Sequence, residues 1–182
     1  AGEHARDRSA NKEAIHHFAE GLKSLEVLPE SEERDRRELA LRIASITPVI
    51  AVEGYVAEAT ARTAERALVL CRQLGDVDRL FPVLYVLWVN RLVGGKYADA
   101  LRLSEEFFEE ANRQQDPGPR LMSHRLRGFS LFMLGDLSAA EEHLRRSLEL
   151  YDPQRHNGLK NKGYGQDPRC ACEAFMSLVR WL

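Results

Sequence analysis

The sequence predicts an all-α fold, a right-handed superhelix (α-solenoid) built from antiparallel helix pairs. A glycine–alanine motif recurs at a nearly constant spacing, and apolar residues at helical spacing follow each full copy. No segment shows the sustained period-two alternation of a half-buried strand. A repeat period of roughly 20–50 residues is typical of solenoids, in which each unit packs only against its neighbours.

The recurring motif is a glycine followed five residues later by an alanine. Its three copies are Gly54 with Ala59, Gly95 with Ala100, and Gly135 with Ala140, so successive glycines are 41 and 40 residues apart. Glycine can end a helix in a left-handed conformation. We expect the alanine to let the next helix pack closely on the previous one. A weaker copy has Ser9 in place of the glycine, with Ala14 five residues later.

The spacing of apolar residues and of the expected breaks predicts where the helices lie. Breaks are expected at 28–31, 74–78 and 114–119. The expected helix pairs are 32–53 with 57–74, 77–94 with 97–115, and 118–134 with 138–151. We therefore expect one array over 1–182, with approximate repeats 1–28, 32–74, 77–115 and 118–151 and a partial repeat 167–182. Three helix starts are also expected: a capping box of Ser138 with Glu141, and caps at Asp116-Pro117 and Asp167-Pro168.

Composition narrows the class of partner. Lys and Arg total 26 against 28 for Asp and Glu, so the formal net charge is −2 and nothing indicates binding to nucleic acid or a membrane. The longest apolar run, Leu80 to Val89, is too short to span a bilayer. Three cysteines and a charged N-terminus without a signal peptide predict a cytoplasmic protein. Because the last expected helix is cut short at Trp181-Leu182, we expect a fragment of a larger protein.

The stretches "GGKYADA" and "LGDLSAA" resemble the tetratricopeptide repeat, although its usual unit is about 34 residues. Over residues 10–182, the phrases "LGDVDRLFPVLYVLW", "GGKYADALRLSEEF" and "YGQDPRCACEAF" resemble the C-terminal repeat region of large bacterial signalling ATPases, many of which carry a class III adenylate or guanylate cyclase domain. This resemblance implies a non-enzymatic interaction or regulatory scaffold for such a protein. Its partner would be a protein or peptide, including other domains of the same chain. The alternative is a stand-alone adaptor that binds a short peptide or an amphipathic helix.

No motif indicates catalysis or a cofactor. The loop "GLKNKGYG", 158–165, has glycines at phosphate-loop spacing but lacks the following Lys and Ser/Thr. Cys170 and Cys172, two residues apart on an expected helix, would point about 200° apart and could not easily bind one metal ion. We therefore expect no catalytic residue, metal or cofactor in this chain.

The candidate binding surface follows from the resemblance, in which the first helix of each repeat lines a concave groove. Positions ten, six and three residues before each glycine then face the groove. The residues expected to bind a partner are Tyr85, Val89, Leu92, Arg125, Phe129 and Phe132. Their apolar character suits an amphipathic helix. Apolar helical positions are also the usual core positions, so these residues either line a groove or pack inside the array.

Overall fold

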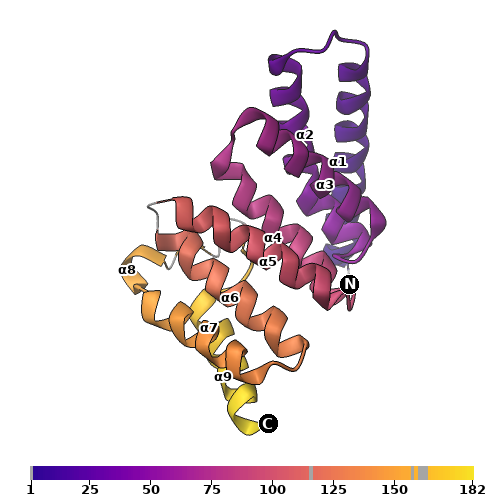
Figure 1. Ribbon diagram of the computed structural model, residues 1–182. Helices are drawn as coiled ribbons and strands as arrows, with labels where there is room; N and C mark the ends of the chain where they lie inside the picture. The colour runs from indigo at the N-terminus through magenta and orange to yellow at the C-terminus, as the bar shows by residue number, and fades with distance from the viewer. Residues whose placement is uncertain (1, 115–116, 157, 160–163) are drawn as a thin grey trace. The chain divides into compact units, whose positions relative to one another are not determined.

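The computed structural model describes residues 2–114, 117–156, 158–159 and 164–182, and of residues 2–9 the backbone alone. All regular structure in these residues is helical, which confirms the all-α prediction (Figure 1). In chain order the helices are α1 (Gly2–Glu26), α2 (Glu32–Glu53), α3 (Glu58–Leu74), α4 (Val77–Val93), α5 (Tyr97–Arg113), α6 (Pro117–Met133), α7 (Leu137–Leu150), α8 (Pro153–His156) and α9 (Pro168–Trp181). No helix in these ranges combines the length and apolar character that a bilayer span requires.

The chain divides into two compact units, Ala1–Val93 and Gly94–Leu182. The predicted pair 77–94/97–115 has one helix in each unit. The other two predicted pairs are present, and their helices are in contact. Helices α2 and α3 correspond to the predicted pair 32–53/57–74, and α6 and α7 to the pair 118–134/138–151.

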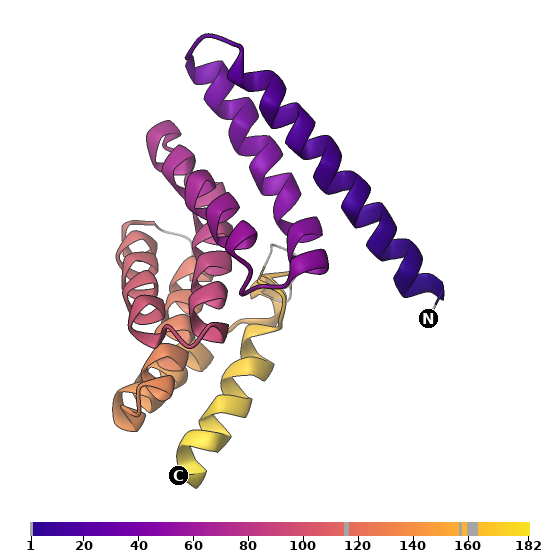
Figure 2. The same cartoon turned by 90° about the vertical axis from the view of Figure 1, so that its right-hand side faces the viewer.

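The first unit consists of α1 to α4, and each helix packs against the next along the chain. Helices α1 and α2 lie side by side and run in opposite directions (Figure 2). The Ser31 side chain caps α2 by accepting a hydrogen bond from the Arg34 amide. Helix α1 continues through Ser9 without a turn. The weaker motif copy at Ser9 is therefore wrong as the turn of a helix pair.

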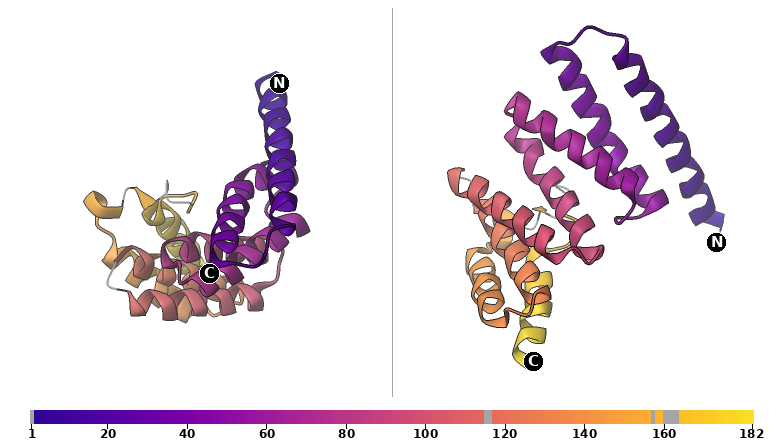
Figure 3. Two further views of the ribbon diagram at one scale, coloured as in Figure 1. Left: turned by 90° about the horizontal axis from the view of Figure 1, so that it is seen from above. Right: turned by 45° about the vertical axis from the view of Figure 1, so that its right-hand side comes forward.

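The second unit places α6 between α5 and α7, and α9 packs against both α7 and α6 (Figure 3). Its core is made of large side chains with no exposed area: Phe107, Leu121, Met122, Leu126 and Leu144. Phe107 comes from α5, Leu144 from α7 and the other three from α6, as expected for amphipathic helices that share one core.

The repetition seen in the sequence recurs in the helices. Helices α4 and α6 begin at residues 77 and 117, and α5 and α7 begin at 97 and 137, so both offsets are 40 residues. The turns before α5 and α7 each contain a glycine with positive φ, 73° at Gly95 and 84° at Gly135. At the second turn, the Gly135 and Asp136 amides donate to the carbonyls of Phe132 and Leu131. These bonds supply donors to carbonyls at the end of α6, where the regular helical pattern of hydrogen bonds stops.

The first motif copy departs from this pattern. Helix α3 begins four residues after Gly54, whereas α5 and α7 begin two residues after their glycines. Ala59 is consequently the second residue of α3 and only half-buried. The fourth helical position, which Ala100 and Ala140 occupy in the other copies, is filled here by the buried Ala61. A fixed offset of five residues from the glycine predicted Ala59 as the packed alanine, because the offset does not account for the longer turn after Gly54.

The helix starts are partly as expected. Asp167 accepts hydrogen bonds from the Arg169 and Cys170 amides, and Pro168 is the first residue of α9. At α7 the cap is Asp136, which accepts from the Ala139 amide, whereas Ser138 lies inside the helix, so the predicted capping box is wrong. Asp116 lies outside the described residues.

Gly128 determines how closely α7 approaches α6. A Cβ atom at Gly128 would lie 2.9 Å from Leu144 Cγ and 3.2 Å from the Ala140 carbonyl oxygen. Because that oxygen belongs to the backbone of α7, it cannot move away as the end of a side chain could. The absence of a side chain at Gly128 therefore permits this helix contact.

We expect Gly128→Ala to lower the free energy of unfolding by about 1–3 kcal/mol, measured by urea denaturation. In a helix without such a contact, Gly→Ala normally stabilises by up to about 1 kcal/mol. Gly21→Ala in α1 is the control, because its Cβ would meet only the flexible Leu41 side chain, at 3.2 Å. Equal effects of the two substitutions would show that α7 is not held this close.

Candidate functional site

The predicted groove residues of the first unit lie on α4. Tyr85 is buried, with 6% of its surface exposed, and its ring stacks on that of Trp88 with centroids 5.8 Å apart. Val89 and Leu92 are half-buried. Tyr85 is thus a core residue of this unit, and Val89 and Leu92 retain some exposure.

The predicted groove residues of the second unit are covered by the chain's own last helix. Arg125 and Phe129 are 1% and 4% exposed, and Phe132 is half-buried. The Phe129 ring stacks on Phe175 of α9 with centroids 3.7 Å apart, and Phe132 meets the same ring edge-on. The Arg125 guanidinium lies 5.4 Å from the centre of the Phe129 ring and donates to Gln166. For Arg125 and Phe129 the core alternative holds, and the prediction that they form an open binding surface is wrong.

We expect Phe129→Ala to lower the free energy of unfolding by about 3–5 kcal/mol, because it removes a buried ring that α9 packs against. Chemical denaturation of the whole chain measures this loss. Phe132→Ala, on the same helix and against the same partner ring, should cost clearly less because Phe132 is only half-buried. Unchanged stability in Phe129→Ala would restore the open-groove interpretation.

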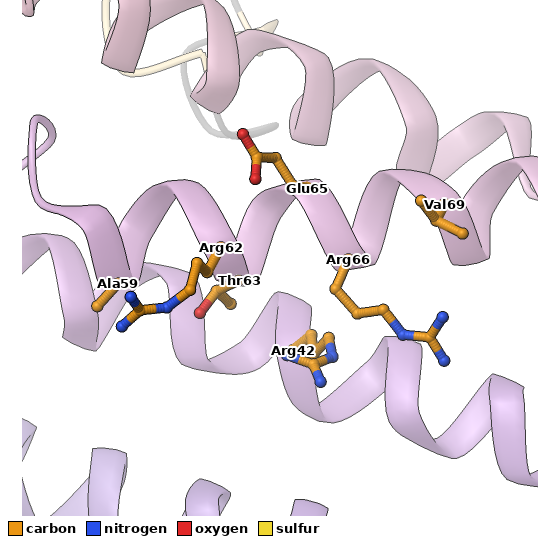
Figure 4. A pocket seen from close by; sticks show the side chains of 7 residues that line it. All are labelled: Arg42, Ala59, Arg62, Thr63, Glu65, Arg66 and Val69. Carbon is orange, nitrogen blue, oxygen red and sulfur yellow. The ribbon is translucent and has the colours of Figure 1, made fainter.

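A different surface of the first unit forms a hollow of about 600 Å³ on α2 and α3. It is lined by Arg42, Ala59, Arg62, Thr63, Glu65, Arg66 and Val69, and we call it the arginine hollow. Arg42 comes from α2 and the other residues from α3. Figure 4 shows the three arginine side chains on one side of α3, whereas Glu65 points to the opposite side. Glu65 there forms an ion pair with Arg91 of α4.

Glu38 of α2 holds two of the three arginines in place. Its carboxylate accepts two hydrogen bonds from Arg66, at 2.9 and 2.7 Å, and one from Arg42, at 2.6 Å. Its side chain is only 10% exposed, against 24% for Arg42 and 40% for Arg66. The pKa of Glu38 is lowered to about 2, first by the hydrogen bonds from Arg66 and then by the hydrogen bond and the positive charge of Arg42. These effects outweigh its burial, which alone would raise the pKa. One buried carboxylate thus orients two guanidinium groups.

We expect Glu38→Gln to lower the free energy of unfolding at pH 7 by about 1–3 kcal/mol, because two partly buried arginines lose their anionic partner. The control is Glu58→Gln, which removes the exposed partner of Arg62 and should change stability much less.

The pH dependence provides a second measure of the Glu38 contact. Because its folded pKa lies below the ordinary 4.5, its contribution is complete above about pH 4.5 and is lost as the pH falls toward 2. Denaturation midpoints across that range should fall less steeply in Glu38→Gln than in the wild type. Identical slopes would contradict the ionised contact.

The cysteines and the glycine-containing loop form no site among the described residues. Cys170 is exposed, whereas Cys71 and Cys172 are buried, and burial raises the pKa of Cys71 to about 11. In the described part of the chain no three His, Cys, Asp or Glu side chains gather as metal ligands would. Within 158–165, Leu159 and Tyr164 are buried, and residues 160–163 lie outside the described residues.

Comparisons with models of protein families, with curated proteins and with solved structures found no match. The resemblance to the tetratricopeptide repeat and to signalling ATPases therefore rests on the sequence phrases alone.

The arginine hollow was not predicted from the sequence, although the helical spacing of some of its residues is visible there. Glu38 and Arg42 stand four residues apart, as do Arg62 and Arg66, and each spacing places both residues on one face of a helix. The decisive contact joins Glu38 to Arg66 across 28 residues. Helical periodicity cannot predict that contact, because it depends on how α2 and α3 are rotated against each other.

Proposed function

We propose that this chain is a non-enzymatic, tetratricopeptide-like scaffold that binds an acidic segment of a protein partner in the arginine hollow. The supporting observation is the set of three arginines on one side of α3, two of them fixed by Glu38. The wider architecture in this proposal is a superhelix of helix pairs, supported by the 40-residue offset between α4/α5 and α6/α7.

The chemistry of the hollow suits carboxylate groups. Each guanidinium has five N–H donors in a planar fork. Glu38 takes two donor nitrogens of Arg66 and one of Arg42, which leaves further N–H groups on both side chains. Arg62 is 64% exposed at the same surface and pairs with the exposed Glu58. An incoming carboxylate can replace water at these groups without disturbing Glu38.

Preorganisation favours binding at this surface. Ordering a long side chain on binding costs about 0.5–1.5 kcal/mol. Arg42 and Arg66 are already held by the Glu38 carboxylate, so this cost is reduced before a ligand arrives. The apolar side chain of Val69 and the methyl of Ala59 line the same hollow and can contact the ligand backbone or an apolar neighbour of the acidic residues.

The test uses a fluorescent 15-residue peptide with four central glutamates and an isosteric peptide with glutamines instead. We expect the acidic peptide alone to bind, and its affinity to fall with added salt. Arg62→Glu should weaken binding about tenfold or more, because it turns an attractive charge into a repulsive one without touching Glu38. Fluorescence anisotropy measures both peptides.

The matched control is Arg102→Glu in α5, an exposed arginine that also pairs with a nearby carboxylate, Asp99, on its own helix. Both variants change the net charge equally, so a general effect of charge would weaken binding in both. The proposal requires that Arg102→Glu stay within about twofold of the wild type. Equal binding of the two peptides, or equal losses in the two variants, would refute it.

The effector that this scaffold serves is a separate proposal, supported by the sequence resemblance alone. It assigns the chain to a larger bacterial signalling ATPase or nucleotide cyclase, with a stand-alone adaptor as the alternative. The open reading frame that contains this sequence distinguishes them, because the first requires an upstream nucleotide-binding domain.

A further inference from the structure

Two histidines of the second unit form a hydrogen-bonded pair between neighbouring helices. His124 of α6 and His143 of α7 place their Nδ1 atoms 2.9 Å apart, and we call them the imidazole pair. One Nδ1–H must donate and the other Nδ1 must accept, so at least one ring is neutral. Phe108 of α5 meets both rings edge-on, with centroids 5.2 and 6.3 Å away. The pair thus lies where three helices of this unit meet.

The surroundings of the pair oppose protonation. Burial, then the neighbouring His143 and three arginines, lower the pKa of His124 to about 4, and burial followed by Arg127 lowers the pKa of His143. The charged groups that act on the pair are Arg120 and Arg127 of α6 and Glu142 and Arg146 of α7. Helix α5 contributes Glu105, which pairs with Arg127. Glu105 and Glu142 partly offset the arginines, since Glu105 pairs with Arg127 and Glu142 with Arg146.

A metal ion does not suit this position. With metal–nitrogen bonds of about 2.0–2.1 Å, two ligand nitrogens of a tetrahedral ion would lie roughly 3.3 Å apart. The two Nδ1 atoms are closer together than that, at 2.9 Å. Three nearby arginines would repel a divalent cation. No third metal-ligating side chain joins the pair among the residues that the structure describes.

We propose that the imidazole pair is an acid-sensitive contact that holds α6 and α7 together at neutral pH and loosens them at mildly acidic pH. In the neutral pair, the Nδ1–H of one ring donates a hydrogen bond to the Nδ1 atom of the other. A first added proton makes one ring an imidazolium that still donates to the other. A second leaves two charged N–H groups facing each other without an acceptor, so the rings must separate.

The pH range follows from the two states of the histidines. An exposed histidine takes up its proton near pH 6.5, whereas folded His124 does so near 4. Between these values the opened state binds more protons, so acidification favours opening. The stabilisation is complete above about pH 6.5 and is lost as the pH falls toward 4. The Glu38 contact in the first unit responds only below about pH 4.5, which separates the two effects.

The test is hydrogen exchange of the whole chain at pH 7 and pH 5, compared as protection factors so that the intrinsic pH effect cancels. The complete shift of His124 would multiply opening about twentyfold between these values. Because the rings are half-exposed, we expect about tenfold lower protection in α6 and α7. Helices α2 and α3 should keep their protection at pH 5. Equal protection of α6 and α7 at the two pH values would overturn the proposal.

The decisive variant is His124→Gln, whose amide can still hydrogen-bond to His143 but does not take up a proton. It should lose most of the extra exchange at pH 5, because the lowered pKa of His124 is the main source of that exchange, while His16→Gln, an exposed position on α1, should retain it. Should His124→Gln fail to fold, NMR titration of the wild-type histidine rings replaces it. Midpoints clearly below 6.5 for both rings support the proposal, and ordinary midpoints refute it.

Discussion

The second unit depends on how closely α7 approaches α6 at Gly128. The missing side chain there lets Leu144 Cγ and the Ala140 carbonyl oxygen approach to 2.9 and 3.2 Å from the position that a Cβ atom would occupy. The same approach brings Ser147 of α7 within 3.0 Å of the Leu121 carbonyl, to which its hydroxyl donates. It also brings His143 within hydrogen-bond distance of His124. A steric condition at one residue thus sets up both the packing and the polar contacts of this helix pair.

The Glu38 contact of the first unit and the imidazole pair of the second unit join neighbouring helices with opposite chemistry. Glu38 is held charged because hydrogen bonds and positive charge outweigh its burial. The imidazole pair is held neutral because burial and nearby arginines act in the same direction. Arginine is a neighbour in both cases, so its effect depends on which group it faces: it stabilises the charge of a carboxylate and destabilises that of an imidazolium.

Local sequence patterns predicted the helices well, and the long-range contacts poorly. Glycine spacing and apolar periodicity were enough to place α2 to α7, because these signals lie within one turn or one helix. The longer turn after Gly54 shifted the packed alanine from Ala59 to Ala61, which a fixed offset could not register. The contacts of Glu38 with Arg66 and of His124 with His143 join different helices. Their formation depends on helix rotation, which an amphipathic pattern specifies only coarsely.

The covering of Phe129 and Phe132 by α9 has a consequence for any ligand of that face. A foreign amphipathic helix could reach these rings only by exchanging with α9, and so would break the stack of Phe129 on Phe175. Its apparent affinity would be reduced by the fraction of molecules in which α9 is undocked. The chain thus carries a tethered competitor for its own apolar face, present at a constant effective concentration whatever the amount of protein.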